Sequence, residues 1–398
     1  MKIAILTSGI FPVPAVKGGA VENLVDFYLE YNDLHKLHDI TVYSVWHPDV
    51  KKSSALMSDV NHYVYIKVNS IWGRIKRYYY QKTHKRGYYH YSIEFFLHEV
   101  IKHLKHQYYD VIILENRPGF VLKLHAKTRA KIVIHQENDY LNTHISNFRQ
   151  IYDSTSLIIN TSDYITQQVR TILYQDPKSR TVLNGIDLNR FYKAKAPNRS
   201  FAKLNPKDFT IVYCGRLTKE KGILQLIQAI KLANKPDISL LVVGASFYGK
   251  DKSPTPFIQQ LKKEAESIKE KIVFTGFVNY LQIPSFLKMA DIAVVPSMWE
   301  EPFGLTVVEA MAAGLPLITT RSGGIPEICE GVATIVDKDD IVNNLTSAIL
   351  DLYNHPERRE AMSKASLERS KFFSKERFAK DFFEALSNGL SVAVQSYT

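Results

Sequence analysis

Two glutamates, Glu301 and Glu309, stand eight positions apart in the segment WEEPFGLTVVEAMAAGLP, residues 299–316. The apolar run predicts a helix, with Glu301 in the loop before it and Glu309 about two turns inside it. Carboxylates accept hydrogen bonds in pairs, which suits vicinal diols such as those of ribose or a hexose. At about 1.5 Å rise per residue their backbones lie at most about 12 Å apart, so the pair can serve two diols of one nucleotide sugar. The alternative is that Glu301 only complements a helix dipole and Glu309 faces water.

Two basic residues follow the apolar segment FTIVYC, residues 209–214. Arg216 comes just beyond this predicted strand, and Lys221 comes five residues later, near the start of the next predicted helix. At the carboxyl edge of a parallel sheet, a guanidinium and an ammonium group can neutralise a pyrophosphate. The alternative is two solvated surface cations, but their position at the end of a strand favours phosphate binding.

A pair of glycines, Gly18 and Gly19, ends the loop SGIFPVPAVKGGA, residues 8–20. The loop is longer than the roughly 2 to 6 residues that usually join a strand to a helix. Free backbone NH groups at the predicted helix start favour an anion, and the missing side chains let a phosphate approach closely. The pair alone is weak evidence, and it is not the spaced glycine triplet of dinucleotide-binding folds.

A basic and aromatic stretch, IWGRIKRYYYQKTHKRGYYHY, covers residues 71–91 and contains no acid. Three interpretations stay open: a solvated loop, a patch that lies on an anionic membrane surface, and a nucleic-acid site. The last is disfavoured because no recognised nucleic-acid module surrounds the stretch. The residues of the predicted membrane-surface patch are Trp72, Arg74, Lys76, Arg77, Lys82, Lys85 and Arg86.

These residues must be positioned by a regular scaffold, and the apolar pattern predicts one. Strands alternate with helical segments such as residues 20–34, which indicates parallel sheets covered by helices. We therefore expect an α/β chain of two tandem Rossmann-like, doubly wound domains facing a central cleft, with ligands at the carboxyl ends of the strands. The predicted strands are KIAILT (2–7), ITVYSVW (40–46), DVIILE (110–115), KIVIHQ (131–136), FTIVYC (209–214), SLLVVG (239–244), KIVFTG (271–276), DIAVVP (291–296), PLITT (316–320) and VATIV (332–336).

A shift in composition at residues 186–208 predicts a linker between the domains. The expected parts are an N-terminal acceptor-binding domain (1–187), a linker (188–207), a nucleotide-sugar-binding domain (208–373) and a C-terminal helix (374–398) that packs back on the first domain.

The bulk composition is that of a globular enzyme. The chain has 398 residues, 45% of them hydrophobic and 23% charged, and a formal net charge of +11, which favours anionic partners. Cys214 and Cys329 have no metal spacing and suggest no disulfide framework, as expected in a reducing cytoplasm. The N-terminus is interpreted as a strand rather than a signal peptide, and no apolar run reaches the ~18 residues of a spanning helix.

With these motifs in place, the chain resembles the retaining nucleotide-sugar glycosyltransferases of family 4, which have the GT-B architecture. Glu301 and Glu309 match that family's paired glutamates, and the segment LNGID (183–187) matches its inter-domain stretch. The segment FTGFV (274–278) resembles its base-binding edge strand. The basic phosphate clamp and the glycine loop of the family are matched by Gly215, Arg216, Lys221, Gly222, Gly18 and Gly19.

The resemblance implies a role for each matching residue. Arg216 and Lys221 hold the donor diphosphate, and Glu309 binds the ribose hydroxyls. Glu301 and the backbone at Phe303, Gly304 and Leu305 hold the transferred sugar and the distal phosphate. Phe277 and Val278 lie at the base, and Gly18 and Gly19 lie at the donor. His135 resembles the family's active-site histidine near the sugar; the alternative is a half-buried structural histidine.

The implied reaction is retaining transfer of a hexosyl group, most often from a UDP-sugar, to a saccharide or lipid-linked saccharide in cell-surface polysaccharide synthesis. No metal and no cofactor are expected, and the triplet at residues 337–339 is interpreted as chance. No nucleic-acid partner is expected, and the location is cytoplasmic or peripheral on the inner face of the membrane. The alternatives are another GT-B enzyme, such as an epimerase or a phosphorylase, or a non-enzymatic sugar or nucleic-acid binder.

Overall fold

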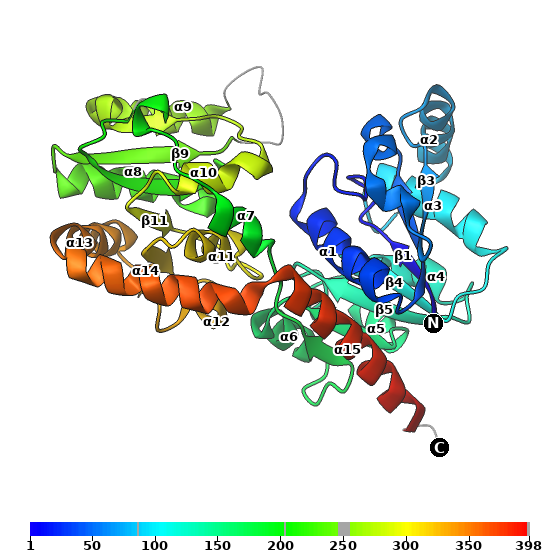
Figure 1. The fold of residues 1–398 in the computed structure, drawn as a ribbon. Helices are drawn as coiled ribbons and strands as arrows, with labels where there is room; N and C mark the ends of the chain where they lie inside the picture. The colour runs from blue at the N-terminus through cyan, green and yellow to red at the C-terminus, as the bar shows by residue number, and fades with distance from the viewer. Residues whose placement is uncertain (86, 203, 246–254, 396–398) are drawn as a thin grey trace. The chain divides into compact units, whose positions relative to one another are not determined.

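The computed structural model describes residues 1–85, 87–202, 204–245 and 255–395. The chain divides into two compact units, one made of residues 1–185 with 375–398 and the other of residues 186–374. In the described part of each unit, a parallel sheet is covered by helices (Figure 1), which confirms the predicted α/β class with two Rossmann-like domains.

The first unit is built on a parallel sheet whose described strands run in the order β3-β2-β1-β4-β5-β6-β7. The predicted strands at residues 2–7, 40–46, 110–115 and 131–136 are confirmed. The sequence did not predict β3, β6 and β7, which are tyrosine-rich, short or polar. The strands are β1 (Lys2–Leu6), β2 (Asp39–Val45), β3 (Asn61–Ile66), β4 (Val111–Glu115), β5 (Lys131–Gln136), β6 (Leu157–Asn160) and β7 (Ser179–Thr181).

Helices cover both faces of this sheet, which is why its central strands carry apolar residues on both faces. Ile3 and Ile5 face the side on which α1 and α15 pack, whereas Ala4 and Leu6 face the side of α3. The helices are α1 (Ala20–His35), α2 (Ile71–Thr83), α3 (Tyr91–Leu104), α4 (Val121–Leu124), α5 (Phe148–Asp153), α6 (Asp163–Arg170) and α15 (Lys375–Gln395), with 3-10 turns η1 (Pro48–Lys52), η2 (Ser54–Met57) and η3 (Pro118–Phe120).

The second unit has a parallel sheet whose described strands run in the order β10-β9-β8-β11-β12-β13. Each of its predicted strands is confirmed, but FTGFV is not a strand throughout. β10 ends at Phe274, and Gly276 has a φ of +72°, which takes the backbone out of the extended conformation. The strands are β8 (Phe209–Cys214), β9 (Ile238–Val243), β10 (Ile272–Phe274), β11 (Ile292–Val295), β12 (Leu317–Thr320) and β13 (Thr334–Val336).

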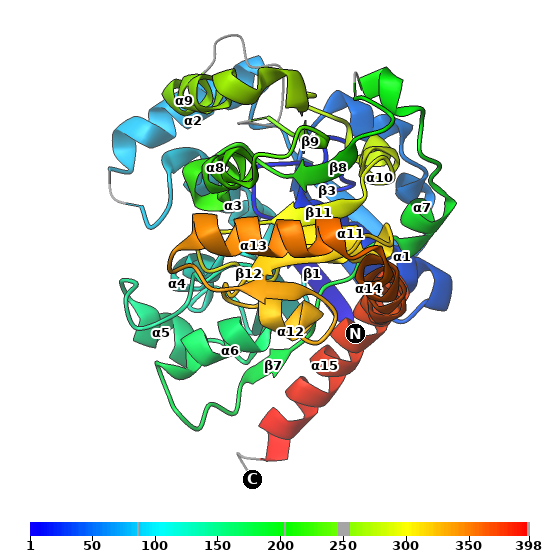
Figure 2. The same ribbon diagram turned by 90° about the vertical axis from the view of Figure 1, so that its left-hand side faces the viewer.

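One face of the second sheet is covered by α8, α9 and α13, and α13 packs beside α8 (Figure 2). The helices are α7 (Leu188–Lys193), α8 (Ile223–Ala233), α9 (Pro256–Ala265), α10 (Ile283–Leu287), α11 (Leu305–Ala312), α12 (Ile325–Cys329), α13 (Ile341–Asn354) and α14 (Pro356–Ser370), with 3-10 turns η4 (Arg199–Ala202), η5 (Lys219–Lys221), η6 (Glu266–Lys271), η7 (Tyr280–Gln282) and η8 (Lys371–Phe373).

Residues 188–207, expected as a linker, contain α7 and η4 and lie inside the second unit. Arg199 ties this segment to the sheet, because its Nη2 donates to both carboxylate oxygens of Asp291 at 2.9 Å. The segment is therefore packed structure rather than free chain.

The helix α15 belongs to the first unit, where it packs against α1. Phe382 is fully buried, and its ring stacks on that of Tyr28 with centroids 4.5 Å apart. Arg377 of the same helix donates to the carbonyl oxygen of Leu183 at 2.6 Å. α15 thus supplies part of the core of a sheet whose strands precede it by hundreds of residues.

We predict that Phe382→Ala destabilises the first unit by about 3 to 5 kcal/mol, because it leaves a cavity beside Tyr28. Hydrogen exchange of the amides of β1 and β4 reports on this unit alone and should accelerate by roughly a hundredfold or more. Lys380→Ala changes an exposed residue of the same helix and should cost less than about 0.5 kcal/mol. Equal protection in Phe382→Ala and the parent would contradict the packing role.

Candidate functional site

The strand order of the second sheet reverses between β8 and β11. In open α/β sheets, ligands bind at the carboxyl ends of the strands at such a point, where the loops on either side diverge. The loop after β8 carries Arg216 and Lys221, and the loop after β11 carries Glu301. Three of the predicted donor residues, Arg216, Lys221 and Glu301, therefore converge on the switch point of the second sheet, whereas Gly18 and Gly19 belong to the first unit.

Lys221 and Glu301 form an ion pair across this point, with 2.6 Å between Lys221 Nζ and Glu301 Oε1. The hydroxyl of Ser297 donates to the same carboxylate oxygen at 2.8 Å. Nζ also lies 5.3 Å from the centre of the Trp299 ring. Glu301 is only 7% exposed, so water does little to stabilise its negative charge, and the charge is balanced by Lys221 instead. The sequence predicted both residues at the donor but not this contact between them.

A glycine makes the contact possible. Gly222 has a φ of +71°, and a Cβ built on it would lie 1.7 Å from the carbonyl oxygen of Pro296. Only glycine lets the backbone of the first loop approach that of the second so closely. Gly222 is also the N-cap residue of α8, which begins at Ile223, and its backbone conformation therefore fixes the position of the neighbouring Lys221.

The loop that carries Glu301 is held from a second side by residues after β12. Gly324 N donates to the carbonyl oxygen of Glu301 at 2.8 Å. The neighbouring Glu300 accepts a hydrogen bond from Gly323 N and pairs with Lys338. Lys338, part of the triplet interpreted as chance, therefore has a structural contact beside the site.

The helix α11 starts at Leu305, so Glu309 lies one turn into it rather than about two as predicted. Phe303 is buried, and Gly304, with a φ of +116°, is the N-cap residue that precedes the helix. Glu309 is 6% exposed, so the alternative that it faces water is wrong.

The environment of Glu309 changes its acidity. Burial raises the pKa of Glu309 to about 7, and a hydrogen bond with Tyr280 opposes that rise only in part. Tyr280 lies in η7, and the guanidinium of Arg190 is 6.0 Å from the centre of its ring. Sequence reasoning missed Tyr280, and its only signal was its position two residues after the predicted base-binding Val278.

Arg216 is exposed, and among the described residues no carboxylate forms an ion pair with it. Its carbonyl oxygen accepts a hydrogen bond from the hydroxyl of Tyr213 at 2.7 Å, which fixes the backbone just after β8. Phe277 is half exposed at the carboxyl end of β10, in the loop that leads to Tyr280. An accessible guanidinium and an accessible aromatic ring thus lie in loops at the same edge of the sheet as the two buried carboxylates.

His135 of the first unit is completely buried, not half-buried. Its Nδ1 lies 2.9 Å from Glu115 Oε2 and its Nε2 lies 3.1 Å from Glu137 Oε1. Burial disfavours the charged ring, but the two carboxylates outweigh it and raise the pKa of His135 to about 10. Both ring nitrogens face carboxylates and the ring has no exposed surface, so the predicted contact of His135 with a sugar stays a prediction.

A carboxylate of the protein itself, that of Glu22, lies against the second residue of the glycine pair. Gly18 and Gly19 have φ of +73° and +114°, and α1 begins at Ala20. The buried Glu22 lies in the first turn and accepts a hydrogen bond from Ser8 Oγ at 3.0 Å, while burial raises its pKa. A Cβ on Gly19 would be 2.2 Å from Glu22 Oε2, so a phosphate placed here meets a like charge when Glu22 is ionised. The role of the pair in donor binding stays a prediction.

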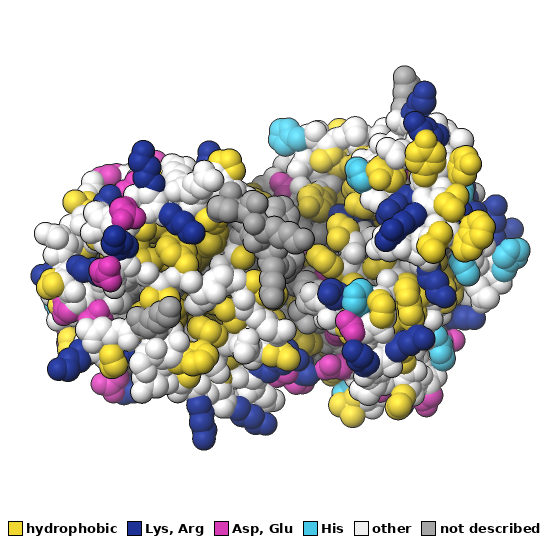
Figure 3. Space-filling model, turned by 90° about the horizontal axis from the view of Figure 1, so that it is seen from above, with side chains coloured by type: hydrophobic (Ala, Val, Ile, Leu, Met, Phe, Trp, Pro, Cys, Tyr) yellow, Lys and Arg dark blue, Asp and Glu magenta, His cyan; other side chains and the backbone are white. Residues whose placement is uncertain are grey.

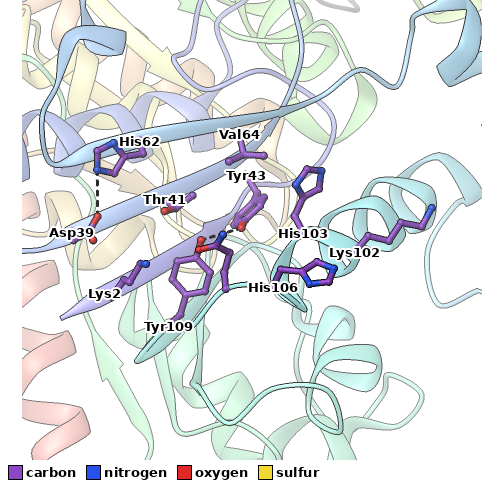
Figure 4. A pocket seen from close by; sticks show the side chains of 11 residues that line it. Lys2, Asp39, Thr41, Tyr43, His62, Val64, Lys102, His103, His106 and Tyr109 are labelled. Carbon is purple, nitrogen blue, oxygen red and sulfur yellow. Dashed lines mark hydrogen bonds and ion pairs between the residues drawn. The ribbon is translucent and has the colours of Figure 1, made fainter.

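A hollow in the first unit lies at the opposite edge of its sheet, at the amino ends of β1, β2 and β3 (Figure 4). Tyr43 and Tyr109 share a hydrogen bond of 3.0 Å there, and His62 lies 3.4 Å from Asp39. It is not at the edge where the predicted site residues lie. The described residues contain no group of three or more His, Cys, Asp or Glu side chains placed to hold a metal ion.

Comparisons with known proteins agree with this arrangement. Residues 195–369 match the family described as "Glycosyl transferases group 1". A lipopolysaccharide 1,2-N-acetylglucosaminetransferase of Salmonella typhimurium is 30% identical over 295 residues, which are 70% of this chain and 73% of that protein. Spore coat protein SA of Bacillus subtilis is 29% identical over 388 residues, 92% of this chain and 93% of that protein.

Solved structures share the fold at lower identity. HepE of Anabaena, solved with UDP and glucose, has a TM-score of 0.73 at 20% identity and covers 97% of this chain and 99% of its own. Sucrose-phosphate synthase of Thermosynechococcus elongatus has a TM-score of 0.73 at 19% identity and covers 98% of this chain and all of its own. The 30% identity to the Salmonella transferase, together with the family match, establishes that this chain belongs to the group 1 glycosyltransferases, and the shared architecture shows that it has the GT-B fold.

Proposed function

We propose that this glycosyltransferase moves a hexosyl group from a nucleoside diphosphate sugar, with UDP as the nucleotide, to a hydroxyl of a saccharide or lipid-linked saccharide, with retention at the anomeric carbon. The observation that carries the proposal is the Lys221–Glu301 ion pair at the switch point of the second sheet, beside an exposed Arg216. This arrangement offers cations to a diphosphate and a carboxylate to a sugar from neighbouring loops.

The leaving group sets the chemical task. The bond from the anomeric carbon to the phosphate oxygen breaks, and its electron pair stays on the diphosphate. Fixed cations lower the barrier by stabilising that developing charge. Lys221 is already oriented by Glu301 and by the Trp299 ring, so little reorganisation is needed when a diphosphate adds to its contacts. Arg216 supplies a second, accessible group of donors.

The same residues suit a retaining reaction. The acceptor oxygen bonds to the anomeric carbon from the face that the phosphate leaves, and its proton passes to the departing phosphate oxygen. Glu301 then serves as a hydrogen-bond acceptor for hydroxyls of the transferred sugar rather than as a nucleophile, because its Oε1 is already engaged by Lys221 and Ser297. No metal or cofactor is part of this proposal.

Glu309 and Tyr280 form the proposed ribose site. A carboxylate accepts two hydroxyl hydrogen bonds, and a ribose diol supplies both. The half-exposed Phe277 lies in the loop that leads to Tyr280 and offers an aromatic surface to the base. UDP is supported by the UDP-bound structure of HepE, although a GDP-mannose-dependent mannosyltransferase is also among the relatives.

The acceptor class is supported by the lipopolysaccharide transferase of Salmonella, which is similar over most of its length. We therefore place this protein in the assembly of a cell-surface polysaccharide or glycolipid. Two alternatives are an epimerase or phosphorylase on the same architecture and a non-enzymatic binder. The products formed from a nucleotide sugar distinguish both of them from a glycosyltransferase.

The experiment that tests the function is a screen of nucleotide sugars for thermal stabilisation, followed by incubation with the stabilising donor. A ligand at a hundred times its Kd adds about 2.7 kcal/mol of stability. We expect UDP-sugars to stabilise the protein and UDP to be released slowly even without acceptor. An altered sugar on intact UDP would indicate an epimerase, and binding without any turnover would indicate a binder.

Lys221→Ala should lower the rate of transfer at saturating donor by roughly a hundredfold, or about 2.7 kcal/mol of barrier, because one cation at the leaving group is lost. Lys219→Ala, in the same 3-10 turn but exposed, is the matched control and should keep the parent rate. Rates are compared only after thermal unfolding shows that each variant folds. A Lys221→Ala rate within about tenfold of the parent, roughly 1.4 kcal/mol, would show that the clamp assignment is wrong.

Glu309→Gln should weaken UDP binding, measured by calorimetry, while it stabilises the free protein at alkaline pH. In the folded protein the pKa of Glu309 is about 7, so ionising this buried carboxyl destabilises the fold. The destabilisation is absent below the pKa of the carboxyl in the unfolded chain, and it grows as the pH rises from there to about 7. A shift of this size corresponds to about 3 kcal/mol. The gain in thermal stability of the variant over the parent should therefore be present at pH 8 and absent at pH 4. Unaltered UDP affinity would contradict the ribose assignment.

A further inference from the structure

The helix α2 presents to solvent the residues that an ordinary surface helix buries. Ile71, Ile75 and Tyr78 have i, i+4, i+7 spacing and form one outward stripe, flanked by Trp72 and Tyr79. The exposed fractions are 76% for Ile71, 74% for Trp72, 64% for Tyr79, 56% for Tyr78 and 42% for Ile75. Isolated exposed apolar residues are normal, but a contiguous stripe on one helix marks an interaction surface.

The opposite side of α2 is anchored to the first unit. Tyr80 is 6% exposed, packs against Phe95 and stacks on His84 with ring centroids 4.0 Å apart. A Cβ on Gly73 would lie 2.1 Å from the carbonyl oxygen of Lys67, so the helix sits directly on the chain before it. Ser70 caps the helix by accepting a hydrogen bond from Gly73 N at 3.0 Å. The stripe is therefore displayed by a helix that is folded and fixed without a partner.

The stripe is bordered by cations. Arg74, Lys76, Lys82 and Lys85 are exposed, and within the described residues none of them forms an ion pair. Arg77 is half-buried and donates to Asn69 Oδ1 at 3.3 Å, so it is partly committed to the fold. Arg86, part of the predicted patch, lies outside the described residues. Figure 3 shows yellow and dark blue side chains together over the part of the first unit that carries α2.

We propose that α2 docks this protein on an anionic lipid surface, lying in the plane of the headgroups. The apolar stripe enters the boundary between headgroups and acyl chains, Trp72 and the tyrosines sit at headgroup depth, and the cations meet lipid phosphates. Thirteen residues make about 20 Å of helix, too short to cross the bilayer. In the described part of the chain, no helix is long and apolar enough to span a membrane.

Lipid fits this surface better than two other occupants. A second copy docked by a twofold axis would place the cations of one α2 against those of the other, with no acid in residues 71–91 to balance them. Single-stranded RNA would use the cations and stack on the tyrosines but would leave Ile71 and Ile75 exposed to water. Only a lipid surface takes the apolar stripe and the cations together.

The test is flotation of the full-length protein with vesicles of phosphatidylcholine, with and without phosphatidylglycerol. The parent should bind the anionic vesicles and bind less as salt is raised. Two variants should each lower the partition coefficient roughly tenfold or more. The first removes three cations (Arg74→Gln, Lys76→Gln and Lys82→Gln), and the second removes two apolar residues of the stripe (Ile71→Ser and Ile75→Ser). The matched control, Lys127→Gln with Lys262→Gln and Lys263→Gln, removes the same charge from exposed sites elsewhere and should bind as the parent does.

A second readout locates the contact. The emission of Trp72 should shift to shorter wavelength on anionic vesicles, and Trp72→Phe should lose that shift, while circular dichroism shows no gain of helix. Three results would overturn the proposal: binding unchanged in both α2 variants, equal binding to neutral vesicles, or loss of a dimer or of RNA binding as the sole effect of the substitutions. Because none of these measurements uses transfer activity, the outcome is independent of the proposed function.

Discussion

The candidate site depends on one close approach of two backbones in the second unit. At Gly222 the chain passes the carbonyl oxygen of Pro296 at a distance that leaves no room for a Cβ. That contact sets the spacing between the loops after β8 and β11, and the Lys221–Glu301 pair closes across it. Any side chain at position 222 would push the loops apart and separate Lys221 from Glu301. The ion pair therefore depends on the backbone conformation at Gly222.

The buried carboxylates of the two units have different kinds of partner. In the second unit, a partly accessible lysine neutralises Glu301, so the pair can exchange contacts with a ligand. In the first unit, His135 is enclosed by Glu115 and Glu137, Glu115 accepts from Tyr28, and Glu137 accepts from Asn184 at 2.6 Å. Such a network is costly to break, because removing one member leaves an unpaired buried charge.

Much of the scaffold follows from local sequence. Segments such as FTIVYC and DIAVVP are short and apolar throughout, which is typical of strands buried on both faces, and both are strands in the structure. The chain positions of Arg216, Lys221 and Glu301 at strand ends were equally predictable, because strands and loops alternate regularly. β7, with the sequence Ser-Arg-Thr, was not, because a three-residue polar edge strand carries no periodicity.

The contacts within the site were beyond local reasoning. Lys221 and Glu301 are 80 residues apart, and their pairing depends on how two loops fold over one sheet edge. The hydrogen bond of Tyr280 to Glu309 depends on the turn that follows β10, where a glycine ends the predicted strand early. The position of Glu22 at the glycine pair could not be predicted either. An acidic residue is common in the first turn of a helix, and only its burial in the structure distinguishes Glu22 from an ordinary one.

The division of the chain also orders its biosynthesis. The first unit is discontinuous, because the whole second unit, residues 186–374, is inserted before α15. A ribosome therefore finishes the second unit while the face of the first sheet that packs on Phe378 and Phe382 is still uncovered. Domains generally fold as they emerge, so the nascent chain exposes an apolar surface until α15 follows. The first unit begins synthesis first and completes its core last.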